Sequence, residues 1–481
     1  MARSTRSPCA LYAQAWAPIH ALDRLGCVAF MNDTGTGLPT AALRRSMRRT
    51  QTSGRLPSIS VAIARRGQIL WAEAVGLADV EAKRAATPET QYRIASITKT
   101  FTAAVTLLMA DDGAFDLDDP LERYVPGTPF GRVTIRRLLA HTGGVQREAP
   151  TAMWETFQAP DRDGLLASLA DAEQVGAPGS HWHYSNLGFG LLGELIARVA
   201  GAAYEQVVEK RLLRPLGLTR TTWYAAEPAA RGYLVHPYQD TAIPQPAFDL
   251  RGKAAAGQLW STTGDLGRWA MALSGGAPEI LPVATVEAMH ALQAMTDPKR
   301  WSEGWGLGLV LWRRGELILA GHDGALPGFL AGFAFDRSSG VAAVALANAG
   351  RGMDRVALTC ELAECAITAL PPDPEVWRPG APCPDELSGV LGRWWSEGEE
   401  TIFTWRGGRL EARRAKDPVD APPSVFAAEG PDRYRVVSGR EQGEVLRVLR
   451  DGAGQVVKLL WATYPYLRSP LPVEPNPGSG W

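Results

Sequence analysis

An apolar stretch from Phe101 to Met109, which follows Ser96 and Lys99, constrains this chain more than any other feature. Its apolar residues fall on nearly every face of a helix, so the helix must be buried inside a folded domain. Ser96 and Lys99 stand three residues apart where the helix is expected to begin, and that spacing puts both side chains on one helical face. The sequence therefore predicts a buried helix that carries a serine beside a lysine.

Burial gives this pair a chemical meaning. Desolvation lowers the pKa of a lysine, and a lysine that is neutral near pH 7 can accept the proton of an adjacent serine. The positive end of the helix would also stabilise the oxyanion that the serine creates when it attacks a carbonyl. Of the 50 basic residues only seven are lysine, and no other lysine has a serine three positions before it. The alternative is that Ser96 caps the helix and Lys99 extends to the surface.

The tripeptide Tyr184-Ser185-Asn186 is a second candidate element. A Pro-Gly turn precedes it and an apolar helical run from Leu191 follows it, so the tripeptide is expected on a loop that enters a helix. Loops held between rigid elements often carry catalytic groups. The alternatives are that Asn186 caps the helix and that Tyr184 is a packed aromatic.

The third element is the segment from Gly321 to Ala325, which contains His322-Asp323-Gly324. Two apolar runs follow it, at 328–335 and 341–347, and they predict a β-hairpin with the His-Asp-Gly on the strand that leads into it. A backbone N–H at the edge of that strand could face Ser96 as a second oxyanion donor. Taken alone, His322 also fits a structural histidine and Gly324 a β-bulge.

In their order and spacing these elements resemble the S-x-x-K, Y-x-N and basic-residue-x-Gly motifs of the serine β-lactamase and penicillin-binding-protein superfamily. The resemblance is to the class C-like branch, which includes D,D-peptidases, D-aminopeptidases and β-lactamase-fold esterases. Leu138 to Gly144 and Leu213 to Leu218 are similar to further segments of the family. The resemblance covers residues from about 40 to 370.

The resemblance implies a catalytic role for four positions. Ser96 is the acylated nucleophile and Lys99 its base. Tyr184 passes a proton to the leaving group and back from water. The backbone N–H groups of Ser96 and Ala325 form the oxyanion hole.

Asn186, His322 and Gly324 are the substrate contacts that the resemblance implies. His322 stands where the β-lactamases carry the lysine of a K-T-G motif, and Asp323 replaces its threonine. The family lysine and threonine recognise the substrate carboxylate, which an aspartate would repel. This departure favours the esterases and D-amino-acid-specific peptidases, some of which carry H-x-G here, over the β-lactamases.

The predicted fold is of the α/β (α+β) class, with an antiparallel sheet flanked by helices and a helical lobe over residues 36–370. Strands at 58–64 and 68–75 are expected to pair with strands between 310 and 347, which places the active site between the two lobes. Residues 1–35 are predicted to be a flexible extension, and Met31 is a possible natural start.

The carboxy-terminal part has a different sequence pattern. Prolines at 371–386 predict a stiff linker, and short strand-like runs then predict a small, barrel-like all-β domain over 387–468 and a flexible tail at 469–481. Strands are expected at 389–395, 401–405, 409–413, 434–437, 445–449 and 456–461. We expect this domain to be a structural cap or a substrate-restricting wall, and an independent binding module is the alternative.

The leading hypothesis is a serine hydrolase that acts on small esters or on D-amino-acid amides or peptides through an acyl-enzyme. The alternatives are a β-lactamase or D,D-carboxypeptidase, an acyltransferase, and a non-catalytic sensor or binding protein. All three catalytic side chains are present, which favours the enzyme. The sequence has no G-x-S-x-G elbow and no H-E-x-x-H or paired C-x-x-C motif, so neither a metal nor another cofactor is expected.

Charge and composition bear on partners and location. A net charge of −1 gives no general attraction to nucleic acid or membranes, so the expected partner is a small-molecule ester or amide. Gln14, His20 and Asp23 interrupt the amino-terminal region where a signal peptide would need an apolar core. A cytoplasmic location is therefore expected.

Overall fold

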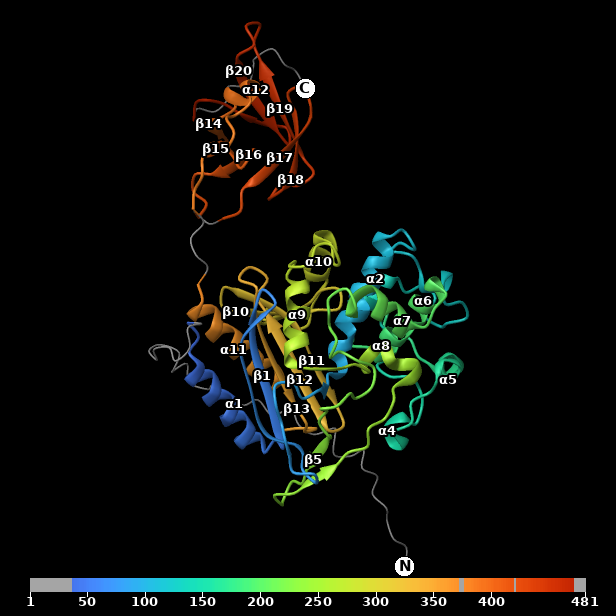
Figure 1. Cartoon of the computed structure of the whole chain (residues 1–481). Coiled ribbons are helices and arrows are strands. Elements are labelled where there is room, and N and C mark those ends of the chain that lie inside the picture. Colours follow the sequence, from blue (N-terminus) through green and yellow to red (C-terminus); the bar gives the residue numbers. More distant parts are fainter. Residues whose placement is uncertain (1–36, 372–375, 419–420, 471–481) are drawn as a thin grey trace, which may run out of the picture. The chain divides into compact units, whose positions relative to one another are not determined.

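The chain divides into two compact units, Met1–Pro372 and Asp373–Trp481, and each is described here by itself. The structure, a computed structural model, describes residues 37–371, 376–418 and 421–470 (Figure 1). The expected extension at 1–35 lies outside the described residues, as does the expected tail from 471 on.

A nine-stranded antiparallel sheet forms the centre of the first unit, in the order β3-β2-β1-β13-β12-β11-β10-β9-β8. Strand β1 pairs with β13 in a register that sets Ile59 opposite Ala347, so strands from the two ends of the unit meet in the sheet. The predicted α/β (α+β) class, with an antiparallel sheet flanked by helices, is confirmed. The strands are β1 (Ser58–Arg65), β2 (Gln68–Asp79), β3 (Arg84–Ala85), β8 (Ala294–Met295), β9 (Glu303–Trp305), β10 (Val310–Arg314), β11 (Leu317–Leu326), β12 (Phe329–Phe335) and β13 (Val341–Ala347).

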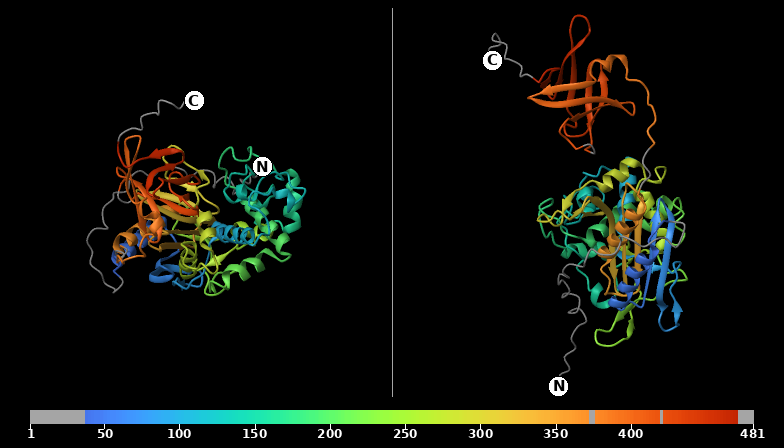
Figure 2. Two further views of the ribbon diagram at one scale, coloured as in Figure 1. Left: turned by 90° about the horizontal axis from the view of Figure 1, so that it is seen from above. Right: turned by 90° about the vertical axis from the view of Figure 1, so that its left-hand side faces the viewer.

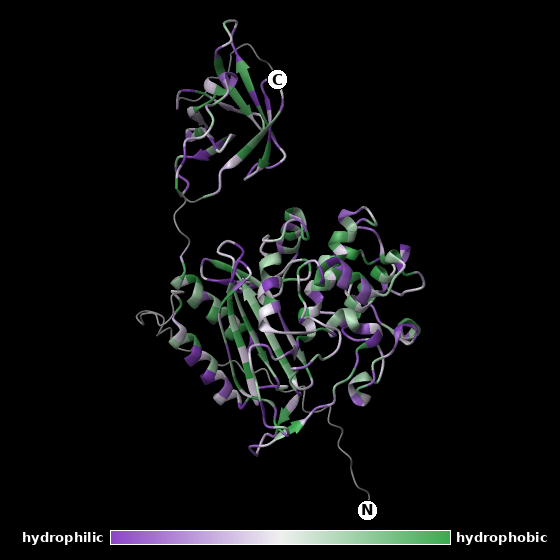
Figure 3. Cartoon of the chain, in the orientation of Figure 1, coloured by the Kyte–Doolittle hydropathy of each residue, from purple (hydrophilic) through white to green (hydrophobic). Residues whose placement is uncertain are grey.

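Helices cover both faces of this sheet (Figures 1 and 2). On one face α1 (Thr40–Gly54) and α11 (Arg355–Ala369) pack on alternate residues of β1, among them Val61 and Ile63. On the other face α9 (Thr263–Leu273) and α2 (Thr98–Asp111) join a larger apolar core. The central strands are buried on both faces and read as continuous apolar runs, which are green in Figure 3.

A helical lobe adjoins this second face and supplies most of the larger apolar core. Two short strand pairs, β4–β7 and β5–β6, connect its loops. The helices are α3 (Ile135–Leu139), α4 (Met153–Thr156), α5 (Arg162–Ser168), α6 (Asn186–Ala200), α7 (Tyr204–Val208), α8 (Ala254–Gly257) and α10 (Val283–His290), and the short strands are β4 (Tyr92–Arg93), β5 (Tyr233–Val235), β6 (Ala242–Pro244) and β7 (Trp260–Ser261).

Within the described ranges no single helix is long and apolar enough to cross a membrane. The pair Asn186–Ala200 and Tyr204–Leu213 meets the length and composition test only together, and it is bent by 78°.

The second unit is an eight-stranded antiparallel meander that is nearly closed into a barrel. Hydrogen bonds between Trp395 and Leu467, of 2.8 and 2.9 Å, bring the first strand back to the end of the last. Trp394 and Phe403 lie in its core. The elements are α12 (Asp385–Ser388), β14 (Gly392–Ser396), β15 (Glu399–Arg406), β16 (Arg409–Arg414), β17 (Ser424–Gly430), β18 (Arg433–Ser438), β19 (Val445–Arg450), β20 (Val456–Trp461) and β21 (Tyr464–Tyr466).

The predicted barrel-like all-β class is confirmed, and two details differ from the prediction. Strands β17 and β21 were missed, because β17 ends in Ala-Ala-Glu-Gly and β21 has only three residues. Helix α12 begins inside the stretch expected to be linker, and its Leu387 is buried in the barrel core.

Candidate active site

Ser96 lies in a 3₁₀ turn, Ala95–Ile97, that runs directly into helix α2. Every residue of α2 from Thr98 to Met109 is buried, as the apolar pattern predicts. Lys99, in the first turn of α2, is 0% exposed, whereas Ser96 is only half-buried. The nucleophile candidate is therefore accessible while its neighbouring amine is not.

The Lys99 amine has three oxygen neighbours. Its Nζ lies 2.7 Å from Asn186 Oδ1, 2.6 Å from the Ala256 carbonyl and 3.2 Å from Ser96 Oγ. The amide and carbonyl oxygens can only accept hydrogen bonds, whereas a serine hydroxyl can also donate. A neutral amine would satisfy the first two with its two N–H groups and turn its lone pair toward the serine. That arrangement is what a general base requires.

The surroundings favour the neutral amine. Burial holds the pKa of Lys99 well below its usual range. The negative charges of Glu148 and Asp323 raise this pKa, and the positive charges of Lys253 and Arg147 lower it. Desolvation is the largest of these effects. Lys99 is therefore neutral, and able to accept a proton, at a lower pH than an exposed lysine.

Tyr184 lies on the loop before α6, as predicted, and its phenol lies beside the Ser96 side chain. Lys99 Nζ lies 5.0 Å from the centre of its ring, and Arg147 Cζ lies 5.0 Å from the same centre. Burial raises the pKa of Tyr184, so the phenol keeps its proton. Ser96 is thus flanked by one group suited to accept a proton and one suited to donate it.

His141 fixes the loop that carries Tyr184. The ring centres of these two residues are 4.4 Å apart, and His141 Nδ1 accepts a hydrogen bond of 3.0 Å from the backbone N–H of Ser185. Burial holds the pKa of His141 well below its usual range, which keeps the ring neutral for this contact. His141 is therefore a positioning residue of the site, a role that no sequence motif indicated.

Asn186 is the first residue of α6, but Ser185 is the cap, because its hydroxyl accepts a hydrogen bond of 2.8 Å from the Gly188 N–H. The capping alternative for Asn186 is therefore wrong. Its amide oxygen faces Lys99, and its amide nitrogen donates to Glu148 Oε1 at 2.5 Å. Both ends of the amide are held, which fixes its orientation.

Glu148 and Lys253 extend this network, and the sequence interpretation missed both. The Lys253 amine forms an ion pair with Glu148 Oε2, and the Lys253 side chain is 3% exposed. The hydrogen-bonded chain therefore runs from Ser96 through Lys99, Asn186 and Glu148 to a second buried lysine. The rarity of lysine in this sequence was the one signal that could have marked Lys253.

His322, Asp323 and Gly324 lie on strand β11, beside the turn that holds Ser96. A Cβ at Gly324 would lie 2.2 Å from the Ile94 carbonyl oxygen, so only glycine permits this approach of strand to turn. The register with β12 is continuous through Gly324, so the alternative of a β-bulge is wrong. Ala325 follows on the same strand and is exposed.

His322 is neutral on this strand, and only the charge balance at Asp323 differs from the expectation. Burial lowers the pKa of His322 to about 4, so the ring is neutral near pH 7. Arg355 binds the Asp323 carboxylate through two nitrogens, at 2.7 and 2.8 Å. That ion pair compensates the negative charge, so the repulsion of a substrate carboxylate by Asp323 loses its basis. The remaining argument against a substrate carboxylate is that position 322 carries no cation.

Different family models match the two units of the chain. The β-lactamase family model matches residues 43–363, and the model of a domain of unknown function, DUF7586, matches residues 383–468. The D-alanyl-D-alanine-carboxypeptidase/endopeptidase AmpH of Escherichia coli K12 is 34% identical over 188 residues, which are 37% of this chain and 47% of AmpH. The chain spans about half the length of the curated relatives it matches.

Two solved structures are also similar. A D-stereospecific amidohydrolase from a Streptomyces species is 27% identical with a TM-score of 0.60, and the match covers 68% of this chain and 98% of that one. The octameric penicillin-binding protein homologue from Pyrococcus abyssi is 24% identical with a TM-score of 0.62, over 90% of this chain and 100% of that one. At that identity the second likeness concerns the fold alone.

Proposed function

This chain belongs to the β-lactamase family of serine hydrolases, and from that premise we propose that it hydrolyses small neutral esters or amides of D-amino acids through an acyl-enzyme on Ser96. The observation that carries the proposal is the set of Lys99 contacts, in which two oxygens occupy the N–H groups and the third neighbour is the Ser96 hydroxyl. Asn186 and Ala256 thereby direct the amine at the nucleophile.

The proposed reaction has two stages. Ser96 Oγ attacks the substrate carbonyl as its proton passes to Lys99, and Tyr184 protonates the leaving group as the scissile bond breaks. Water then attacks the acyl-enzyme and gives up a proton to the Tyr184 and Lys99 pair. The Ser96 oxygen regains a proton from the same pair as the acyl group leaves. The backbone N–H groups of Ser96 and Ala325 would hold the oxyanion in both stages.

The substrate class is supported by two observations. The neutral His322 offers no charge to a carboxylate beside the reacting carbonyl. The similar amidohydrolase from Streptomyces is described as D-stereospecific, and a D-amino acid amidase from Ochrobactrum anthropi is 26% identical over 68% of this chain with a TM-score of 0.58. We extend that preference for D-amino-acid amides to this chain as part of the proposal.

Intact-protein mass spectrometry tests the reaction class. The protein is mixed with p-nitrophenyl esters, L- and D-alanyl amides and a cephalosporin, and Ser96→Ala is run beside it. We expect an acyl adduct or turnover with the esters and the D-amides, and neither with Ser96→Ala. An adduct that persists in the serine variant would overturn the nucleophile assignment.

The substrate preference gives a second measurement. We expect kcat/KM for p-nitrophenyl butyrate to exceed that for a penicillin by ~10²-fold or more, a difference of about 3 kcal/mol in transition-state binding. The reason is that His322 replaces a charge-bearing contact of the β-lactamases. Equal values would contradict this interpretation. Arg147→Ala would then show whether the exposed Arg147 binds the carboxylate instead.

Lys253→Met probes the second buried lysine through the pH profile. The groups that act on Lys99 are Lys253 and Arg147, which lower its pKa, and Glu148 and Asp323, which raise it. Activity requires neutral Lys99, so it is lost as the pH falls through that pKa. Removal of the Lys253 charge should raise the pKa of Lys99. The acid limb of the pH profile, where kcat/KM falls with falling pH, should then move to higher pH.

Lys253→Arg is the matched control, because it keeps the charge and should leave the limb in place. The neutral rings of His141 and His322 and the phenol of Tyr184 also face this region and are unchanged in both variants. If the acid limb of kcat/KM keeps its position in Lys253→Met, then Lys253 acts only as a structural partner of Glu148.

A further inference from the structure

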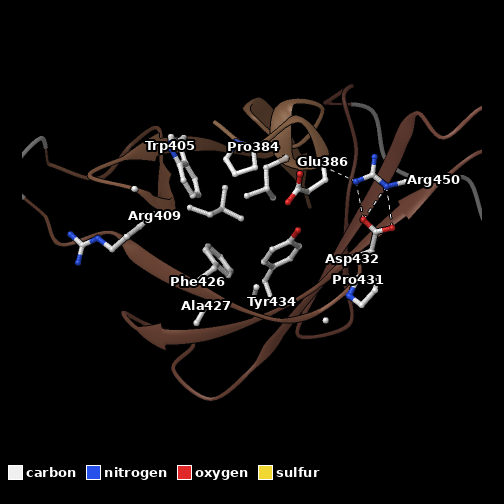
Figure 4. A pocket seen from close by; sticks show the side chains of 15 residues that line it. Pro384, Glu386, Trp405, Arg409, Phe426, Ala427, Pro431, Asp432, Tyr434 and Arg450 are labelled. Atoms are coloured by element: carbon white, nitrogen blue, oxygen red, sulfur yellow. Dashed lines mark hydrogen bonds and ion pairs between the residues drawn. The ribbon is translucent and has the colours of Figure 1, made fainter. Parts of the chain in front are cut away.

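The second unit contains a cavity of about 710 Å³ that the proposed function does not use (Figure 4). It is lined by helix α12 and by the turns that join β15 to β16 and β17 to β18. Small-molecule sites usually measure ~300–1,000 Å³, and the mouth of a β-barrel is a common place for them. The cavity therefore has the size and position of a ligand site.

Three aromatic side chains form much of its wall, Trp405, Phe426 and Tyr434 (Figure 4). The Trp405 indole N–H donates to the Ala381 carbonyl at 3.2 Å, which fixes that ring at the rim. Among the described residues no ring contact joins these three side chains to one another, and no lysine or arginine lies over any of them. Phe426 packs on Phe403 and Trp461 and is buried with Tyr434 in the barrel core, whereas Trp405 is half-buried, so the cavity wall is formed by the edges of a packed aromatic cluster.

The cavity is lined by two acidic and two basic side chains, which are unequally paired. Arg450 binds the Asp432 carboxylate at 2.8 to 3.0 Å, and Arg409, which points away from the cavity in Figure 4, lies 3.6 Å from Glu411. Glu386 has no ion-pair partner in the part of the chain that the structure describes. Arg450 also donates to the Glu386 backbone carbonyl at 2.7 Å, so the Glu386 carboxylate lies near this guanidinium without forming an ion pair with it.

That carboxylate faces the aromatic wall. Figure 4 shows the Glu386 carboxylate and the Tyr434 hydroxyl turned into the space from opposite sides. Burial raises the pKa of Tyr434, and the charges of Asp432 and Glu386 raise it further, so their negative field reaches the ring. Aromatic faces attract organic cations, and a nearby carboxylate adds to that attraction.

We propose that this cavity binds a small organic cation, a primary or quaternary ammonium that carries an apolar group. The cationic head would lie between Glu386 and the rings of Trp405 and Tyr434. The apolar group would contact Leu387 and Leu410, whose side chains line the same cavity. This site is separate from the Ser96 centre and does not depend on the proposed hydrolysis.

Calorimetric titration of the full chain with benzyltrimethylammonium tests the proposal, with benzyl alcohol and phenylacetate as neutral and anionic probes. We expect the ammonium to bind more tightly than the other two. Glu386→Gln should raise its Kd by ~3- to 5-fold, the range for an interaction with an exposed carboxylate. Trp405→Ala should weaken it by a similar factor through loss of a cation–π contact.

Two controls locate the binding. Glu444→Gln removes an exposed carboxylate in the turn between β18 and β19, outside the cavity, and should leave the Kd unchanged. Lys99→Met alters the Ser96 centre and should also leave it unchanged. Tighter binding of phenylacetate, no heat with the ammonium, or an unchanged Kd in Glu386→Gln would each overturn the proposal. Glu386 is exposed, so its substitution leaves the fold intact.

Discussion

Replacement of Lys99 by arginine is expected to lower the hydrolysis rate by ~10²- to 10⁴-fold, the usual worth of a general base. Arginine keeps a positive charge and can still donate hydrogen bonds to Asn186 and Ala256, but it cannot give up its proton in a protein. The variant therefore separates a base from an ion-pair partner. The measurement is kcat/KM for a p-nitrophenyl ester at pH values above and below neutral.

Two companions make this result interpretable. Lys99→Met also removes the base but introduces no charge into the buried site, so loss in both variants excludes an effect of arginine's size or charge alone. Lys299→Arg makes the same exchange at an exposed lysine and should leave activity unchanged. Retention of more than about a tenth of the activity by Lys99→Arg would contradict the assignment of Lys99 as base.

The parts of the site that could be predicted are those that local spacing encodes. Ser96 and Lys99 share one helical face because they are three residues apart, and Tyr184 and Asn186 enter together on one loop. The all-apolar helix also made burial of Lys99 a prediction. These four residues do meet in the structure. Lys99 Nζ lies within hydrogen-bond distance of Ser96 and of the sequence-distant Asn186, and Tyr184 lies beside Ser96.

The parts that could not be predicted depend on pairs that no local pattern marks. Glu148 and Lys253 are 105 positions apart, and each alone reads as an ordinary charged residue. Asp323 and Arg355 are 32 positions apart, so their ion pair could not be predicted from the sequence. An uncompensated carboxylate repels an anionic substrate, whereas a carboxylate in an ion pair does not, so this one contact removed the expected repulsion.

The acid and base assignments both rest on burial, which acts in opposite directions on an amine and a phenol. Burial lowers the pKa of Lys99 and raises that of Tyr184, although both side chains contact Ser96. A shared environment thus yields a neutral amine that can accept a proton and a phenol that can donate one. Two such groups beside one nucleophile are what acyl transfer to and from serine needs.

Tyr184→Phe is expected to affect amides far more than activated esters in the acylation step. An amine leaving group must be protonated as the scissile bond breaks, whereas p-nitrophenolate leaves readily without a proton. We expect the rate of acylation by a D-alanyl amide to fall by ~10²- to 10⁴-fold, the worth of a general acid, with a much smaller fall for the p-nitrophenyl ester. Stopped-flow release of p-nitrophenol and of the amine measures both.

The same variant should accumulate its acyl-enzyme when it is given the ester. Acylation remains fast, but deacylation requires the attacking water to give up a proton, which the Tyr184 hydroxyl no longer relays. Mass spectrometry should then find the adduct on Ser96 minutes after the ester is consumed, while the wild type shows none. Tyr124→Phe, which removes a hydroxyl bound to Asp119 elsewhere in the unit, is the matched control. Normal turnover of both substrates by Tyr184→Phe would leave Lys99 to handle every proton alone, and the two-group mechanism would be wrong.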